Sequence, residues 1–345
     1  MIFKLHTTFP DALEHDWNTL LSEGIVHVPF LRHEYLKNWW LTRGGGEWPP
    51  EANLVVVSAH ENEHLVGIAP LFQSAYEGKS KLLFLGSIEI SDYLDFIVRP
   101  ADLDNFLAGL FQFLNDSPEV PNWEQLDLYN LFETSPSLQQ LQVCADAQGW
   151  KYQNQRCYHA PVINLPGDWE EYLASLDKKQ RHEVRRKIRR LEEAPVSLRW
   201  YFAEDENSLD AEIDDFLELM AQDPEKEAFL TEEMVTAMSS IIHSAFQQGY
   251  LQLAFLEIDG QKAAAYLNFD YDNQLWIYNS GLNRSLMAYS PGWVLLGYLI
   301  RWANENKRRS FDFMRGDEDY KYRFGAVDRY LQRVTISRFS ASHQD

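Results

Sequence analysis

The stretch from Gln274 to Met314, QLWIYNSGLNRSLMAYSPGWVLLGYLIRWANENKRRSFDFM, decides the fold. Its first residues, Gln274–Ser280, predict a buried strand. Ser290-Pro291-Gly292 opens a helix that we expect to run to Asn306, because serine can cap a helix and proline suits its first turn. Arg309–Met314 predicts a second strand. A crossover helix makes the two strands that it joins parallel in one sheet, so the predicted class is α/β.

A weak internal repeat extends this pattern to the whole chain. Asn53–Leu71 and Tyr250–Asn268 lie 197 residues apart (250 − 53), and each reads as two apolar strands joined by a tight turn. This similarity predicts two copies of one α/β unit, as residues 1–150 and 151–345. We expect a last strand, Tyr330–Ile336, to complete the second copy.

Composition excludes several classes of protein. The 345 residues include 31 Lys and Arg and 52 Asp and Glu, a net charge of −21 (31 − 52). General nucleic-acid binding and attachment to anionic membranes both need a basic surface. The longest uncharged stretch, Ser285–Ile300, is short for a membrane span and contains Pro291. The N-terminus does not combine basic residues with a long apolar run, so we expect a cytoplasmic protein.

No metal site is expected. The two cysteines, Cys144 and Cys157, lack the paired spacing of a zinc site. His60–His64 matches the H-E-x-x-H pattern, which binds zinc when one helix carries both histidines. Here both flanks read as strands, so a hairpin turn is predicted instead.

Charge is unevenly distributed along the chain. Lys178–Arg190 carries eight basic residues and one Glu, whereas Glu204–Glu233 carries 13 acidic residues and one Lys. Trp169–Glu193 reads as one helix, or as two if Asp177 is a cap. The basic helix could bind an anion, or it could pair with the acidic stretch that follows it.

The strongest site signal is Phe311–Gly325, FDFMRGDEDYKYRFG, which crowds charged and aromatic residues beyond the end of the predicted second strand. Ligand sites of open α/β sheets collect at such strand ends. Its acidic residues and Arg315 could form a structural ion-pair network. Tyr320 supplies a proton donor, and Lys321 and Arg323 supply cations suited to an anionic ligand.

On these residues the sequence resembles the CelD-like acetyltransferase family, which is related to FemAB-type transferases and to the GNAT superfamily. The basic helix carries the pattern R-x-x-x-R-R-x-x-R-R-L from Arg181 to Leu191. The C-terminal part contributes Tyr278–Gly292 and Phe311–Gly325. The first half adds looser matches, which are Pro29-Phe30, the VGIAPL run Val66–Leu71 and Ser91-Asp92-Tyr93.

The resemblance implies two tandem GNAT-like units, each a mixed, mostly antiparallel sheet flanked by helices. It implies an N-acetyltransferase-type enzyme that moves an acyl group from acetyl-CoA or another acyl-CoA to an amine or hydroxyl, in polysaccharide or cell-envelope biosynthesis. In such folds the two parallel strands splay apart. The pantetheine arm lies between them, and the pyrophosphate sits on the helix N-terminus.

The resemblance also implies roles for individual residues. Tyr320, or Tyr322 after it, would protonate the departing thiolate. A backbone N–H of Gln274–Ser280 would hold the oxyanion. The base candidates are Asp312, Asp317 and Glu318. The predicted donor-binding residues are Tyr278, Ser290, Gly292, Trp293, Arg315 and Lys321. The residues expected to bind the acceptor or another anion are Arg181 and Arg185.

One departure from the family keeps other functions open. GNAT phosphate loops follow Gln/Arg-x-x-Gly-x-Gly/Ala, and Arg284–Trp293 does not fit this spacing. FemAB-type relatives use aminoacyl-tRNA as donor, and the basic helix could serve tRNA locally. A non-catalytic binding or scaffold role is the third alternative.

Overall fold

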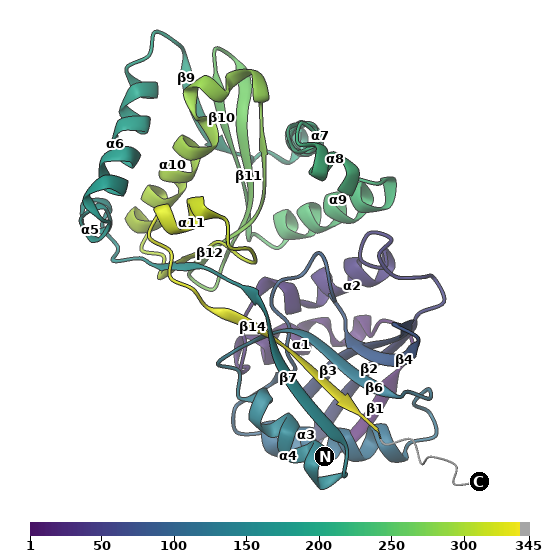
Figure 1. The fold of residues 1–345 in the computed structure, drawn as a ribbon. Coiled ribbons are helices and arrows are strands. Elements are labelled where there is room, and N and C mark those ends of the chain that lie inside the picture. Colours follow the sequence, from purple (N-terminus) through teal and green to yellow (C-terminus); the bar gives the residue numbers. More distant parts are fainter. Residues whose placement is uncertain (339–345) are drawn as a thin grey trace. The chain divides into compact units, whose positions relative to one another are not determined.

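The chain folds into two compact units in the computed structural model, which describes residues 1–338 (Figure 1). Among the described residues, unit 1 contains 1–158 and 330–338, and unit 2 is His159–Arg329. The two-unit organisation agrees with the internal repeat. The division differs from the predicted 1–150 and 151–345, because the chain returns to unit 1 at its end.

Unit 2 is built on a six-stranded sheet in the order β8-β13-β12-β11-β10-β9. Neighbouring strands are antiparallel except for β12 and β13, which are parallel. The predicted crossover is therefore confirmed. The strands are β8 (Val162–Asn164), β9 (Leu198–Phe202), β10 (Leu251–Ile258), β11 (Gln261–Tyr271), β12 (Gln274–Leu282) and β13 (Ser310–Asp312).

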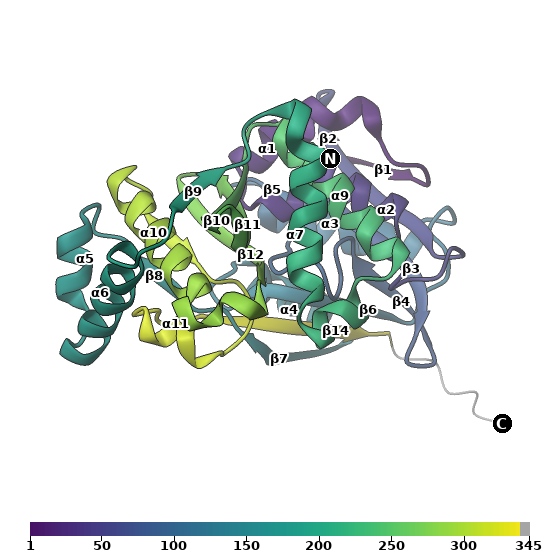
Figure 2. The same cartoon turned by 90° about the horizontal axis from the view of Figure 1, so that it is seen from above.

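Helices cover both faces of this sheet. In Figures 1 and 2, α6 and α10 lie on one side of the strands and α7 on the other. On the side of the sheet that carries α6 and α10, an apolar core joins these two helices and α5 to the strands. The helices are α5 (Trp169–Ser175), α6 (Lys178–Glu192), α7 (Leu209–Ala221), α8 (Pro224–Phe229), α9 (Glu232–Gln247), α10 (Pro291–Glu305) and α11 (Asp319–Arg323), with a 3₁₀ helix, η4 (Arg284–Tyr289), before α10.

Unit 1 has an eight-stranded sheet in the order β1-β2-β3-β4-β6-β14-β7, with β5 paired to β3. Its strands β4 and β6 are parallel. The strands are β1 (Ile2–His6), β2 (Asn53–Glu61), β3 (His64–Tyr76), β4 (Lys79–Phe84), β5 (Ile97–Val98), β6 (Gln125–Phe132), β7 (Lys151–His159) and β14 (Tyr330–Ser337). The helices are α1 (Glu14–Ser22), α2 (His33–Leu41), α3 (Leu103–Asp116) and α4 (Ser137–Ala147), with 3₁₀ turns at Asp11–Leu13 and Pro29–Leu31.

The two sheets repeat one topology. The antiparallel run β1-β2-β3-β4 matches β9-β10-β11-β12, and a parallel strand follows each run, β6 in unit 1 and β13 in unit 2. The predicted offset is confirmed, since β2 ends at Glu61 and β10 at Ile258 (258 − 61 = 197).

The prediction for the last strand is wrong. β14 does not complete the second unit but pairs antiparallel with β6, Val334 opposite Leu128. The position that β14 occupies beside β6 is taken in unit 2 by β8, beside β13. In each unit, the strand beside the second parallel strand therefore comes from a part of the chain that does not belong to the strand-helix-strand crossover.

The predicted turn of the first hairpin is confirmed. His60 and His64 lie at the β2–β3 turn, as expected from the strand-like flanks.

Among residues 1–338, no three His, Cys, Asp or Glu side chains are grouped so that they could hold a metal ion. A helix long and apolar enough to cross a membrane is not found in this described part of the chain.

The basic segment forms two helices rather than one. Asp177 caps α6, because its side chain accepts a hydrogen bond from the Gln180 N–H at 2.9 Å. The alternative that α6 pairs with Glu204–Glu233 is wrong within the described residues. The carboxylates bound by α6 are Glu170 and Glu183, and the acidic stretch begins with α7, which covers the opposite face of the sheet.

Candidate active site

The parallel strands β12 and β13 separate soon after they meet. Only three residue pairs join them, from Gln274–Ser310 to Trp276–Asp312, while β12 continues to Leu282. Beyond Asp312 the chain follows β8 instead, because the Phe313 N–H donates to the Pro161 carbonyl at 3.0 Å. This early end of the pairing is consistent with the splay that the resemblance implied, and it lies at the carboxyl end of β13.

A β-bulge marks β12 where the strands part. Ile277 lies opposite Asn268 and Asn279 lies opposite Leu267, so Tyr278 is the extra residue. A bulge bends its strand and redirects backbone groups, and bulges are frequent beside active sites. The Tyr278 ring lies 5.4 Å from the Phe269 ring, centroid to centroid.

The N-terminus of α10 lies next to the end of β12. A Cβ added to Gly292 would come 2.6 Å from the Leu282 side chain, so this position requires a close approach. The Tyr266 hydroxyl of β11 donates to the Gly292 carbonyl at 3.3 Å and ties the helix start to the sheet. The first backbone N–H groups of a helix have no acceptor inside it, so Gly292 and Trp293 present donors suited to phosphate.

Ser290 does not cap α10 as predicted. Its side chain makes no capping hydrogen bond, because its backbone is left-handed, with φ of 55°, rather than extended as in an ordinary N-cap. Pro291 occupies the first turn, as expected. The left-handed residue instead joins the end of η4 to the start of α10.

Trp293 connects the start of α10 to two other elements. Its ring lies 4.5 Å from the Phe324 ring beside α11, and the Lys187 ammonium of α6 lies 3.9 Å from its centroid. Its indole N–H is buried and has no hydrogen-bond partner in the described structure. Lys187, which is also ion-paired with Glu183 at 3.3 Å, therefore places an ammonium beside the first turn of α10.

Tyr320 on α11 is mostly buried beside the splay. Its ring packs edge-on against Phe313 at 6.0 Å, and it contributes after burial to raising the pKa of Tyr266. Burial, followed by the Glu318 carboxylate, raises the pKa of Tyr320 well above its usual range. Its hydroxyl makes no hydrogen bond to any other described residue. Tyr320 is thus a protonated phenol with an uncommitted hydroxyl.

The second tyrosine candidate is already engaged. The Tyr322 hydroxyl donates to Asp328 at 2.6 Å, and the other carboxylate oxygen of Asp328 lies 3.1 Å from His159 Nδ1. This bonded cluster favours Tyr320 over Tyr322 as the proton donor.

Asp312 is held in a structural pair. It is fully buried, it is ion-paired with Arg329, and it accepts a hydrogen bond from the Met314 N–H at 2.9 Å. Unit 1 has the same arrangement, since Asp127 is the third residue of β6 and is bound by Arg333. A pair that recurs in both units favours a role in folding over a role as the base.

The loop before α11 separates the remaining candidates. Asp317 and Glu318 are exposed, and Lys321 is buried. The Lys321 ammonium donates to the Arg315 and Gly316 carbonyls at 2.6 and 3.2 Å and contacts Glu318 at 2.8 Å. These contacts commit Lys321 to holding the loop, whereas Asp317 stays available as a base.

Arg181 and Arg185 are turned toward α5. The Arg181 guanidinium donates to the Ala174 carbonyl at 3.3 Å, and Arg185 is ion-paired with Glu170. The cation that α6 brings to the start of α10 is Lys187 instead, and the sequence prediction missed it.

Lys226 is a second missed residue. It is the one lysine of the acidic stretch Glu204–Glu233, which is the signal that could have singled it out. Its ammonium lies 2.9 Å from Asn279 Oδ1 and also bonds to Ser280, directly after the bulge of β12.

Comparisons with known proteins give one family match and several similar folds. Residues 178–322, all within unit 2, match the family described as "Acetyltransferase (GNAT) domain". Curated protein sequences give no significant match. The crystal structure of FemX is 10% identical, has a TM-score of 0.66 and covers 97% of both chains.

Two further solved structures share the fold. A conserved protein of unknown function from Bacteroides thetaiotaomicron VPI-5482 has a TM-score of 0.62 at 10% identity, over 98% of this chain and 100% of that one. L-PGS from Bacillus licheniformis has a TM-score of 0.50 at 10% identity, over 81% and 82%. At such identities the likeness concerns the fold alone.

The sheet topology and the family match together define the class of fold. The fold consists of two tandem GNAT-like units, and residues 178–322 of unit 2 match a GNAT acetyltransferase domain. The predicted fold is thereby confirmed. The narrower likeness to the CelD-like family stays a prediction.

Proposed function

We propose that the protein is an acyltransferase that moves an acyl group, with acetyl as the first candidate, from acyl-CoA to an amine or hydroxyl acceptor. The observation that carries this proposal is the early separation of β12 and β13 beside the start of α10. A parallel pair that parts after three residues leaves backbone groups of β12 without a neighbouring strand. An acyl-pantetheine arm can pair with such groups as a strand would.

The donor's phosphates fit the start of α10. The N–H groups of Gly292 and Trp293 and the helix dipole favour an anion there, and Lys187 adds a positive charge. These donors would replace the usual GNAT phosphate loop, because Arg284–Trp293 does not have the spacing of that loop. Ser290 shapes the loop through its left-handed backbone.

The reaction needs three functions. A carboxylate, for which Asp317 is the best placed candidate by exposure, takes a proton from the acceptor. A backbone N–H of β12 near the bulge at Tyr278 stabilises the oxyanion that forms when the acceptor attacks the acyl carbon. As the carbon–sulfur bond breaks, Tyr320 donates its proton to the leaving thiolate.

Ligand-dependent stability tests the proposal. Acetyl-CoA at 100 times its dissociation constant should raise the free energy of unfolding by roughly 2.7 kcal/mol. Thermal unfolding is followed with acetyl-CoA, with longer acyl-CoAs and with CoA alone. If no acyl-CoA stabilises the protein at millimolar concentration, acyl transfer from CoA is contradicted and a non-catalytic role is favoured.

One observation favours a second candidate, an aminoacyl-tRNA-dependent transferase of the FemAB type. The outer face of α6 is basic and exposed, through Lys178, Lys179, Arg186, Arg189 and Arg190. Binding of tRNA to such a face would weaken steeply as salt rises. A tRNA titration at low salt supports this candidate if binding occurs, and its absence there removes it.

A further inference from the structure

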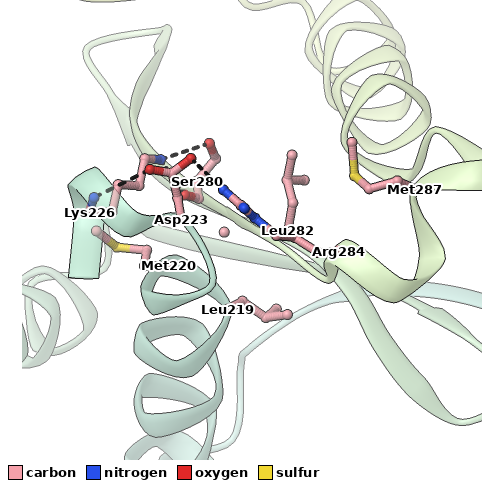
Figure 3. A pocket seen from close by; sticks show the side chains of 9 residues that line it. Leu219, Met220, Asp223, Lys226, Ser280, Leu282, Arg284 and Met287 are labelled. Atoms are coloured by element: carbon pink, nitrogen blue, oxygen red, sulfur yellow. Dashed lines mark hydrogen bonds and ion pairs between the residues drawn. The ribbon is translucent and has the colours of Figure 1, made fainter.

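A pocket opens beside the end of β12 in unit 2. Its volume is about 440 Å³, and it is lined by residues of the end of α7, the start of α8, β12 and η4 (Figure 3). Its lining divides into an apolar part and a polar part. The apolar residues are Leu219, Met220, Leu282 and Met287, and the polar residues are Asp223, Lys226, Ser280 and Arg284.

Lys226 is the distinctive group of this pocket. Its ammonium is partly buried and is held by Asn279 Oδ1 at 2.9 Å and by the carbonyl and, at 3.4 Å, the hydroxyl of Ser280. These oxygens are all neutral. Within residues 1–338, no carboxylate oxygen lies within ion-pair distance of this ammonium.

The nearby charges do not neutralise Lys226. Asp223 pairs with Arg284 at 3.3 Å and caps α8 through the Glu225 and Lys226 N–H groups. Glu318 is committed to Lys321 at 2.8 Å. Burial lowers the pKa of Lys226, and the more distant Asp223 and Glu318 act in the opposite direction. A cation removed from water without a paired anion is costly, which favours an anionic ligand at this position.

The pocket also adjoins the proposed reaction site. Ser280 and Gly281 line it, and they follow the bulge at Tyr278 by two and three residues (280 − 278 and 281 − 278). The packing of α7 against β12 fixes this edge, because a Cβ on Gly281 would come 2.6 Å from Leu219 Cβ. A molecule in the pocket would thus lie against the strand that would hold the acyl group.

We propose that this pocket binds the acceptor of the transfer, and that the acceptor carries a carboxylate held by Lys226 and an apolar chain packed against Met220 and Leu282. The identification of the ligand as the acceptor rests on the proposed function. The preference for a carboxylate rests on the pocket alone. A compact ammonium suits a single carboxylate, and the apolar wall suits a chain of several methylene groups.

Two small probes of equal shape test the preference. Hexanoate and hexanamide differ in charge at the end that would meet Lys226, and their affinities are measured by isothermal titration at pH 7. Wild-type protein should bind hexanoate at least tenfold more tightly than hexanamide. Lys226→Met should bind the two equally, and Lys151→Met, a change of an exposed lysine on β7 in unit 1, should keep the wild-type preference.

A second variant guards against a folding defect. Lys226→Gln removes the charge but keeps an N–H donor for Ser280, so it should unfold cooperatively and should also lose the preference. Equal affinities of wild-type protein for the two probes, or a preference that survives in Lys226→Gln, would overturn the inference.

Acetyl-CoA binding is measured in the same samples to separate the two proposals. If hexanoate is preferred and acetyl-CoA does not bind, the carboxylate site stands and the proposed function fails. If acetyl-CoA binds and hexanoate is not preferred, the inference about the acceptor fails alone.

Discussion

Asp312 is ion-paired with Arg329 inside unit 2, and the carboxylate also accepts the Met314 N–H. This pair joins the end of β13 to the residue before β14. Asp127 and Arg333 are paired at the corresponding strand of unit 1, where Lys81 also contacts Asp127 at 2.7 Å. The recurrence indicates that each parallel strand is fixed at its third residue by a buried charge.

The first prediction concerns this pair. Asp312→Asn should lower the free energy of unfolding by about 2–3 kcal/mol, because a buried charged hydrogen bond is lost and Arg329 keeps its charge. Chemical denaturation measures the change. Asp317→Asn, at an exposed position, should leave stability within about 0.5 kcal/mol. Unchanged stability of Asp312→Asn together with complete loss of turnover would make Asp312 the base instead.

The second prediction concerns the proton donor. Tyr320→Phe should lower kcat at least tenfold with little change in the dissociation constant of acetyl-CoA, since the hydroxyl acts on the leaving thiolate. The raised pKa of Tyr320 keeps it protonated, so this group should cause no fall in kcat between pH 7 and 10. Tyr322→Phe is the control, and an equal loss in that variant would refute the assignment.

The third prediction concerns donor affinity. Lys187→Met should weaken acetyl-CoA binding about fivefold and leave kcat nearly unchanged, because a cation near the helix start is worth about 1 kcal/mol toward phosphate. Isothermal titration and steady-state kinetics separate the two quantities. Lys179→Met, on the same helix but without the Trp293 contact, should bind as the wild type does. An effect on kcat alone would show that Lys187 does not serve the phosphates.

The fourth prediction concerns Asp95 in unit 1. Burial raises the pKa of this carboxyl to about 6, although hydrogen bonds from Ser135 and Ser137 lower it. The folded state therefore binds the proton more tightly than the unfolded state, where the pKa is near 3.8. The stabilisation that Asp95 contributes should be lost as pH rises from about 4 to 6, and the loss should be about 3 kcal/mol at most.

Asp95→Asn should remove this part of the pH dependence. Denaturation curves at pH 4, 5, 6 and 7 give the slope for both proteins. Parallel pH profiles of wild type and variant would contradict the assignment to Asp95.

Much of the fold could be predicted because its signals are local. The crossover Gln274–Met314 contains both parallel strands and the helix that joins them, so chain pattern alone defined it. The hairpins β2–β3 and β10–β11 were likewise visible as paired apolar runs around short turns. The partner of β14 was not predictable in this way, because Val334 pairs with Leu128, about 200 residues earlier (334 − 128 = 206).

The sequence predicted which strands and helices form the candidate site, but it predicted less well which side chains are available there. Gly292 lies against Leu282 at the end of β12 and Tyr320 packs against Phe313 beyond β13, while their roles stay predictions. Lys321 looked like a ligand for anions, yet its ammonium is turned inward to carbonyl groups, and residue type alone does not report direction. Lys187 and Lys226 were missed because their importance depends on contacts with Trp293 and Ser280 that only the folded chain creates.

The most direct test of the central claim locates the donor on the chain. Amide hydrogen exchange is measured with and without saturating acetyl-CoA. Binding between β12 and β13 should protect the amides of Tyr278–Leu282 and those of Gly292 and Trp293, with little change in unit 1. Binding that protects neither segment would contradict an acyl-CoA site at the splay, as would the absence of any binding.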